Sequence, residues 1–207
     1  MIGYWHHPVV RLSVVCLSVC LSVCRSVGKL QRRLWGVHDV SLKTKIAVYR
    51  AVVLTTLLYG CETWTLYRRS IRRLDQFHLR CLRKIARVKW QDRIPNTDVL
   101  NICGIMGMEA FLLKAQLRWV GHIMRMPDSR IPKQVFLGQL AVGKRLQCGP
   151  VLRYKDTLKV NLKQCGIDPS ALGDDTQDRS AWRTLCHEAV RKGVQPRSNL
   201  SAWPCVN

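Results

Sequence analysis

Residues 68–88 read RRSIRRLDQFHLRCLRKIARV, and this stretch decides the fold expected for the chain. At about 100° per residue, a helix here gathers the apolar side chains from Ile71 to Val88 on one arc of roughly 140°. The basic side chains fall on the opposite arc, namely Arg68, Arg69, Arg72, Arg73, Arg80, Arg83, Lys84 and Arg87. The pattern predicts an amphipathic helix that buries one face and leaves a row of positive charge in solvent.

The whole chain shares this excess of positive charge. Its 207 residues hold 34 Lys and Arg against 13 Asp and Glu, a formal net charge of +21. Such a charge opposes compaction and favours an anionic partner, and the phosphate backbone of RNA or DNA is the first candidate. The 47% hydrophobic content is high enough for a core, which excludes a disordered basic tail. A solvated basic face without a partner is the alternative.

Helical patterns continue on both sides of the basic stretch. Further helices are predicted over 41–58, 96–103, 108–126, 154–165 and 180–191, with Ser41 and Ser180 as N-caps. We therefore expect a mainly α protein, a bundle of about five to six helices with irregular loops, and a short β-hairpin stays open as an option. Residues 133–150 are rich in glycine and are predicted as a loop or short strands.

Aromatic and basic side chains elsewhere extend the predicted nucleic-acid interface. Trp64 and Tyr67 stand next to the first arginines of the basic stretch and could stack on unpaired bases. Lys144 and Arg145 in the glycine-rich loop form a second candidate phosphate contact. The competing interpretation, which we favour, is that the interleaved aromatics fill the core, namely Tyr59, Trp64, Tyr67, Trp90 and Trp119. In the helix over 108–126, the residues expected near one apolar stripe are Phe111, Leu112, Ala115, Trp119 and Met126.

The first 28 residues differ from the rest. LSVVCLSVCLSVCRSV at 12–27 repeats Leu-Ser-Val-Cys, which the codons CTG-TCT-GTC-TGT would encode, so the simplest hypothesis is a translated tetranucleotide repeat. The spacing of Cys16, Cys20 and Cys24 matches no usual metal-ligand pattern. The uncharged run 12–24 is 13 residues long, short of the roughly 18 that span a bilayer. We divide the chain into a low-complexity segment (1–28), a helical region (29–195) and a frayed tail (196–207).

No constellation in the sequence predicts a reaction centre, a metal site or a cofactor. The ten cysteines include no CxxC pair and, from Cys61 onward, are expected to be reduced, buried thiols of an intracellular protein. The sequence Gly173-Asp174-Asp175 imitates a polymerase signature, but its flanks predict a loop and a helix start instead of a hairpin. His78 lies on the apolar arc and is expected to be packed and hydrogen-bonded. We therefore expect no enzyme activity.

Six strings, in order along the chain, resemble the reverse transcriptase of LINE-type (non-LTR) retrotransposons, in the part that follows the polymerase palm. They are LLYGCETWTL at 57–66, DQFHLRCLRKI at 75–85, KWQDRIPNTDVL at 89–100, LKAQLRWVGHIMRMPDSRIPKQ at 113–134, KDTLKVNLKQCGIDP at 155–169 and DRSAWR at 178–183. The resemblance covers roughly 29–195 and implies thumb and post-thumb sequence, which grips template and primer while another domain performs the chemistry.

The resemblance also implies what a complete relative would carry. The catalytic strand with paired aspartates would precede residue 29, where the Leu-Ser-Val-Cys repeat stands, and the endonuclease would lie further upstream. We therefore expect a truncated, non-catalytic fragment that binds RNA or DNA backbone with little sequence specificity, alone or with other parts of such a polymerase. The alternatives are a translated genomic remnant with no evolved function, and a membrane-surface protein that uses the apolar segment near its start.

Overall fold

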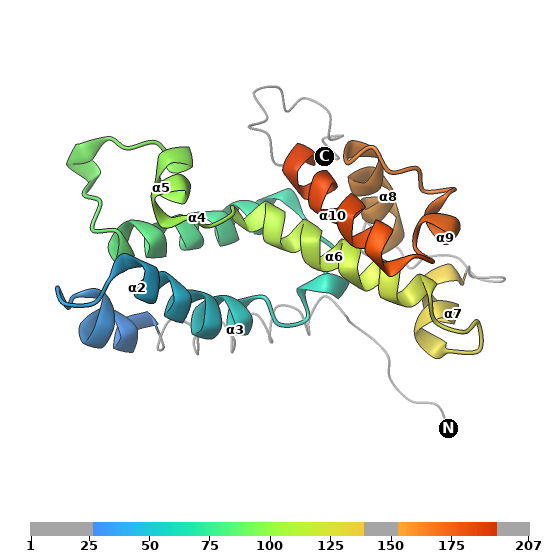
Figure 1. The fold of residues 1–207 in the computed structure, drawn as a ribbon, viewed down its shortest axis with the longest axis horizontal. Helices are drawn as coiled ribbons and strands as arrows, with labels where there is room; N and C mark the ends of the chain where they lie inside the picture. The colour runs from blue at the N-terminus through green and yellow to red at the C-terminus, as the bar shows by residue number, and fades with distance from the viewer. Residues whose placement is uncertain (1–26, 139–152, 194–207) are drawn as a thin grey trace, which may run out of the picture. The chain divides into compact units, whose positions relative to one another are not determined.

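The computed structural model describes residues 27–138 and 153–193 (Figure 1). Within these ranges every regular element is helical and no strand occurs, which confirms the mainly α prediction. The elements are η1 (Gln31–Trp35), α2 (Leu42–Val48), η2 (Tyr49–Leu54), α3 (Thr55–Leu57), η3 (Cys61–Thr63), α4 (Arg68–Ile85), η4 (Trp90–Asp92), α5 (Asn96–Cys103), α6 (Met108–Met124), α7 (Ile131–Leu137), α8 (Tyr154–Gln164), α9 (Leu172–Asp175) and α10 (Arg179–Gly193). They outnumber the expected five to six helices because several are only one or two turns long.

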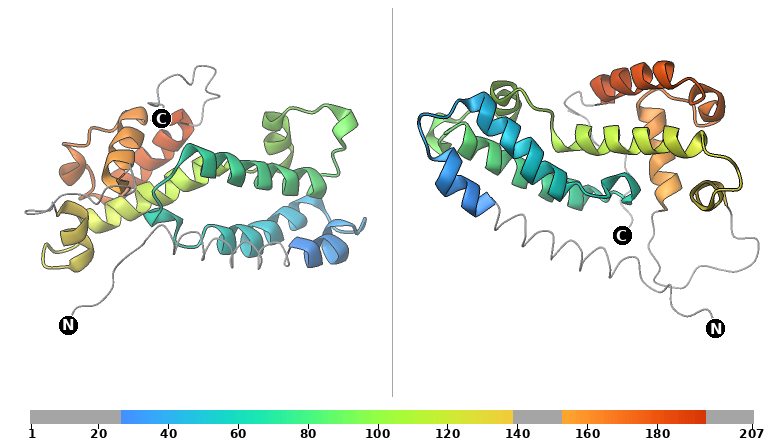
Figure 2. Two further views of the ribbon diagram at one scale, coloured as in Figure 1. Left: turned by 180° about the vertical axis from the view of Figure 1, so that it is seen from behind. Right: turned by 60° about the horizontal axis from the view of Figure 1, so that its bottom comes forward.

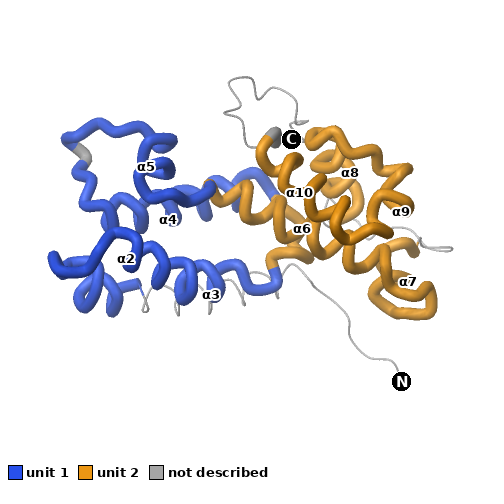
Figure 3. Tube along the Cα trace, in the orientation of Figure 1, with its two compact units in different colours: residues 1–60, 67–106 blue, residues 61–66, 107–207 orange. Residues whose placement is uncertain are grey.

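The described residues form two compact units (Figure 3). Unit 1 comprises 27–60 and 67–106, and unit 2 comprises 61–66 together with the described residues from 107 onward. The chain therefore leaves unit 1 for the short η3 segment and returns to it at α4. The predicted boundaries near residues 28 and 195 stay predictions.

The first long helical run of unit 1 contains an irregular stretch. Ser41 has an extended backbone and its hydroxyl accepts a hydrogen bond from the Thr44 amide at 3.2 Å, which confirms the predicted cap. The run then widens into a π-helix over Tyr49–Leu54, where β-branched residues are frequent. Along this stretch Val53 is buried, whereas the adjacent Val52 is 42% exposed.

The basic helix predicted from Arg68 forms as α4 and packs beside the first helical run (Figure 2). Its predicted end at Val88 was wrong, because α4 ends at Ile85 and Arg87 takes a left-handed backbone with φ of 57°. The buried residues of its apolar face are His78, Leu79, Cys81, Leu82 and Ile85. The neighbouring α5 ends at Cys103, as predicted, and its C-cap Gly104 also has φ of 57°.

A hydrogen-bonded chain of polar groups crosses the core of unit 1. The fully buried His78 ring contacts the Tyr49 hydroxyl through Nδ1 at 2.8 Å and the Met106 carbonyl oxygen through Nε2 at 3.1 Å. Because a carbonyl only accepts, Nε2 donates to it, and Nδ1 accepts from Tyr49. The prediction of a packed, hydrogen-bonded His78 is confirmed. Burial lowers its pKa from the ordinary value of 6.5, because it penalises the charged ring.

Unit 2 is built around α6, which α8 crosses and α10 accompanies (Figure 2). The core that joins the three helices is apolar and contains Leu113, Leu117, Val120, Leu158, Leu162, Trp182 and Cys186. The apolar stripe predicted for this helix was wrong: Phe111, Ala115, Trp119 and Met126 are only half-buried, although Leu112 is buried. The buried line is instead the one that faces α8 and α10, which the periodicity of α6 alone does not identify.

Gly121 sets how closely α10 approaches α6. The Trp182 indole lies over it, and a Cβ at position 121 would stand 2.2 Å from Trp182 Nε1. The same indole nitrogen donates a buried hydrogen bond to the Leu117 carbonyl at 3.2 Å. A side chain at 121 would push these two helices apart, so glycine is required there by space.

The η3 segment is tied to unit 2 by backbone carbonyls. The Tyr154 hydroxyl donates to the Glu62 carbonyl at 2.8 Å, and the buried Gln116 amide donates to the Trp64 carbonyl at 3.2 Å. Asn161 of α8 in turn donates to the Gln116 side-chain oxygen at 3.1 Å. These bonds satisfy buried polar groups and explain why 61–66 belong to unit 2.

Two further local predictions need correction. Residues 133–137, expected in a loop or strand, are helical in α7, where Pro132 occupies the first turn, a position that suits proline. The N-terminus of α10 is capped by Asp178, not Ser180: the Asp178 carboxylate accepts from the Ser180 amide at 2.8 Å. The hydrogen bond from the Ser180 hydroxyl, together with this bond from the Ser180 amide, lowers the pKa of Asp178. Asp174 and Asp175 are exposed on the short α9, which has no hairpin geometry.

The described cysteines are free and buried, as predicted; they are Cys61, Cys81, Cys103, Cys165 and Cys186. Burial raises the pKa of the Cys61 and Cys186 thiols to about 11, which keeps both protonated at neutral pH. The remaining cysteines, including the three in the repeat segment, lie outside the described residues. Within 27–138 and 153–193, no group of three His, Cys, Asp or Glu could hold a metal ion, and no helix is long and apolar enough to cross a bilayer.

Candidate nucleic-acid interface

The solvent face of α4 is a row of arginines. The helix carries seven Lys or Arg side chains and one carboxylate, Asp75. Arg69, Arg72, Arg73 and Arg80 are exposed and make no hydrogen bond or ion pair among the described residues, and Arg68, half-buried, makes none either. At 1.5 Å per residue, the stretch from Arg69 to Arg80 is about 16 Å long. We call these four exposed residues the open arginines.

The last cations of the predicted row contact the chain itself. The Arg83 guanidinium donates to the Ile94 carbonyl at 2.7 Å and to the Asn96 side chain at 3.0 Å. Lys84 donates to the Gln31 side chain at 3.2 Å. Arg87, beyond the helix end, donates to the carbonyls of Gly36 and Val37, each at 3.0 Å. These three, predicted with the others as phosphate contacts, already have partners.

A buried lysine also donates hydrogen bonds to the chain, and with Arg83, Lys84 and Arg87 it forms a second set of cations, which we call the bonded group. Lys45 is 4% exposed, and its ammonium donates to the Trp35 carbonyl at 3.2 Å and the Val37 carbonyl at 2.6 Å. The carbonyls of residues 35–37 lie at the end of η1 and just past it, where a helical segment leaves acceptors without amide partners. Lys45 and Arg87 supply the missing donors, and their charge also suits the negative end of the segment.

The other predicted contacts belong to different units or lie outside the described residues. Tyr67, 40% exposed, immediately precedes α4 in unit 1, whereas Trp64 is half-buried in unit 2. Lys144 and Arg145 lie outside the described residues. The core interpretation of the aromatics was wrong for Tyr59, which is 84% exposed, and for Tyr67. The buried large aromatics are Trp35, Tyr49 and Trp182.

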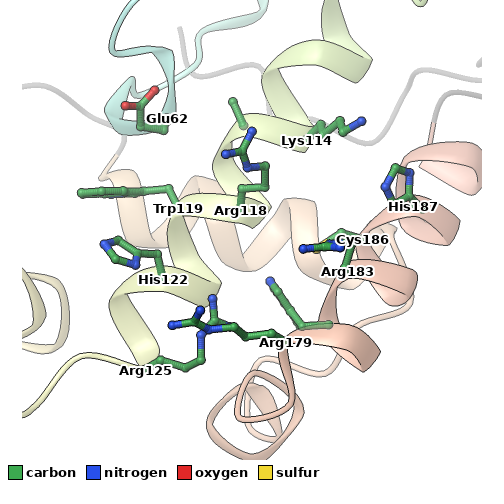
Figure 4. A pocket seen from close by; sticks show the side chains of 12 residues that line it. Glu62, Lys114, Arg118, Trp119, His122, Arg125, Arg179, Arg183, Cys186 and His187 are labelled. Atoms are coloured by element: carbon green, nitrogen blue, oxygen red, sulfur yellow. The ribbon is translucent and has the colours of Figure 1, made fainter.

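Unit 2 holds a second basic surface that we did not predict. A cavity of about 860 Å³ lies between α6 and α10, with Glu62 of η3 at its edge (Figure 4). We call it the α6–α10 groove. Its basic and imidazole lining comprises Lys114, Arg118 and His122 from α6, Arg125 just past the end of α6, and Arg179, Arg183 and His187 from α10. Among the described residues, Glu62 is the one carboxylate that lines it.

The spacing in the sequence contains the signal for this groove. Positions 114, 118, 122 and 125 follow one face of α6, and positions 179, 183 and 187 follow one face of α10. Each series taken alone indicates only a solvated basic stripe. The contact between Gly121 and Trp182 places the two stripes beside each other, and that contact depends on tertiary packing.

An aromatic side chain lines the groove beside the charged ones. The half-buried Trp119 lies with its ring centroid 5.8 Å from that of His122, at 45° between planes. Arg125 is held by a hydrogen bond of 2.8 Å to the Thr176 carbonyl, while Arg118, Arg179 and Arg183 are exposed and make no such bond among the described residues. With one carboxylate and several guanidinium groups, the described lining suits the binding of anions and contains no pair of acids.

Comparison with protein-family models, with curated proteins and with solved structures found no match for this chain. The functional argument therefore depends on the residues and their geometry.

Proposed function

We propose that this chain binds the phosphate backbone of nucleic acid through the open arginines of α4, with little sequence specificity and without a catalytic centre of its own. The observation that carries the proposal is that these four guanidinium groups face solvent along one helix while having no acidic or carbonyl partner among the described residues. Phosphate is the anion that a linear array of guanidinium groups complements, by charge and by paired hydrogen bonds.

We further propose that the chain derives from the post-palm part of a non-LTR retrotransposon reverse transcriptase. The support is the order of the six strings, together with the contacts between them. Asn161 of the string at 155–169 reaches Gln116 of that at 113–134, which reaches Trp64 of that at 57–66. Trp182 of the string at 178–183 packs on Gly121. Strings that depend on one another for packing argue for one inherited folding unit over chance similarity.

The test is a filter-binding titration of the full chain with duplex RNA and duplex DNA at several salt concentrations. Each neutralised phosphate contributes about 0.9 to the slope of log affinity against log salt. Replacing all four open arginines by glutamine should make this slope shallower by about 3.6 units if each contacts one phosphate, and should weaken binding by about 100-fold or more in 0.1 M salt. A wild-type chain whose affinity does not respond to salt would refute the proposal.

A charge-matched variant controls for net charge. Arg32, Lys43, Lys159 and Lys163 are exposed cations elsewhere, and their replacement by glutamine removes the same charge. If this variant loses as much affinity as the first, binding reflects total charge and the α4 surface has no special role. A wild-type slope in the control variant supports the proposal.

A further inference from the structure

The α6–α10 groove differs from the α4 surface in shape. The open arginines line the outside of one helix, whereas the groove is concave and receives cations from two helices (Figure 4). Its volume of about 860 Å³ falls within the range of pockets that enclose small ligands. A cavity of this size admits one or two nucleotides that have left a helix, and it is too small for a duplex.

The free cations of the groove come from both of its walls. Arg118 on α6 and Arg179 and Arg183 on α10 are exposed and make no hydrogen bond or ion pair among the described residues. Charges brought together in this way repel one another, and nearby Arg125 adds to the repulsion although it contacts Thr176. An anion placed between the walls would relieve that repulsion, and a phosphodiester group accepts hydrogen bonds from several guanidinium groups at once.

The aromatic residues of the groove narrow the choice of anion. Trp119 lines the cavity beside these cations, and its ring is only half-buried. An inorganic anion makes no use of such a ring, whereas an unpaired base stacks on it. Cationic grooves with aromatic platforms are the usual means by which proteins hold single strands.

We propose that the α6–α10 groove binds a short single-stranded segment of nucleic acid, with its phosphates against Arg118, Arg179 and Arg183 and one base stacked on Trp119. The inference extends the proposed function to unit 2. It uses none of the open arginines, so either site can fail without the other.

The first experiment measures binding of the full chain to a single-stranded oligouridylate and to a duplex of equal charge. The Arg118→Gln, Arg179→Gln, Arg183→Gln triple variant should bind the single strand about tenfold more weakly at 0.1 M salt and the duplex nearly as well as wild type. Its control, Lys43→Gln, Lys159→Gln, Lys163→Gln, removes the same charge at exposed positions outside the groove and should leave single-strand binding nearly unchanged. Equal losses in both variants, or an unchanged triple variant, would overturn the proposal.

The second experiment uses the unaltered chain and therefore does not depend on how a variant folds. A single-stranded oligonucleotide with 5-iodouracil at each position is photo-crosslinked to the protein, and the modified peptide is identified by mass spectrometry. Crosslinking at Trp119 supports stacking in the groove. Crosslinking confined to the α4 region supports the proposed function and refutes the groove as a single-strand site. Conversely, if the variant without the open arginines loses duplex binding and keeps single-strand binding, the groove binds single strands independently of the α4 surface.

Discussion

The cations of the α4 region fall into two groups that differ in what they contact. Arg69, Arg72, Arg73 and Arg80 point to solvent, whereas Arg83, Lys84, Arg87 and the buried Lys45 donate hydrogen bonds to carbonyl or amide oxygens of the chain. Both groups contribute equally to the net charge. Only the first can exchange solvent for phosphate without breaking a bond that the fold uses, so charge density alone overstates the size of the binding surface.

The same contrast occurs within unit 2. Arg125 is bonded to the Thr176 carbonyl and Lys133 to both the Met126 carbonyl and the Asp128 carboxylate, while Arg118, Arg179 and Arg183 have no such partners among the described residues. The packing of α10 on α6 determines where those three lie.

The largest effect is expected from the packing that positions the groove. Replacing Gly121 by alanine places a Cβ against the Trp182 indole and should lower the free energy of unfolding of unit 2 by about 3 kcal/mol, an overpacking cost. Urea unfolding followed by circular dichroism measures it. The Gly173→Ala variant is the control, because a Cβ there meets open space. Similar stabilities for the two variants would show that Trp182 does not pack tightly on α6.

Lys45 should give the next largest effect. Methionine keeps much of the apolar length of the side chain but removes both hydrogen bonds, leaving the Trp35 carbonyl without this donor in a buried site. We expect the free energy of unfolding to fall by about 2 kcal/mol. Lys43→Met, two residues away and exposed, should change it by less than about 0.5 kcal/mol. An equal change in the free energy of unfolding of the two variants would indicate that the Lys45 ammonium faces solvent and does not make these hydrogen bonds.

Arg87 is an exposed member of the bonded group and should give a smaller change. Arg87→Gln removes the bonds to the Gly36 and Val37 carbonyls, of which Val37 keeps its bond from Lys45. The free energy of unfolding should fall by about 1 kcal/mol, with no loss of duplex affinity beyond that of one distant charge. A large loss of duplex affinity with unchanged stability would indicate that Arg87 contacts phosphate, as the open arginines are proposed to do, and does not stabilise the fold.

His78 provides a pH-dependent test of the polar core. Its folded-state pKa lies below the 6.5 of the unfolded chain, so the unfolded state binds the proton first as pH falls. The contribution of His78 to stability should be constant above about pH 6.5 and should decrease below it until the lowered folded-state pKa is reached. Comparing urea unfolding of wild type and His78→Asn across this range isolates the effect. An identical pH dependence in both proteins would contradict a buried, neutral His78.

The sequence predicts those features of the fold that depend on interactions between residues close in sequence. The Ser41 cap, the helix over 96–103 and the position of His78 on the apolar face depend on interactions within a turn or two of helix, and each is predicted correctly. The π-helical turn of Tyr49–Leu54 and the end of α4 at Ile85 are not predicted by the helical period. Just past that end, Arg87 donates to the carbonyls of Gly36 and Val37, about 50 residues away in sequence.

The candidate sites divide in the same way. The open arginines follow directly from one helical period. The partners of Arg83 and Arg87 are 11 and about 50 residues away in sequence, and no local pattern indicates them. The α6–α10 groove needs Gly121 to meet Trp182, which is a matter of shape between distant segments.

The most direct test compares two triple variants on the same helix region with the same change in net charge. One is Arg69→Gln, Arg73→Gln, Arg80→Gln, and the other is Arg83→Gln, Lys84→Gln, Arg87→Gln. Duplex affinity and thermal unfolding are measured for both. We predict that the first loses about 30-fold or more in affinity with an unchanged unfolding temperature, and that the second unfolds about 5 °C or more lower while losing much less affinity. Equal losses of affinity with unchanged unfolding temperatures would contradict the division between the open and the bonded cations.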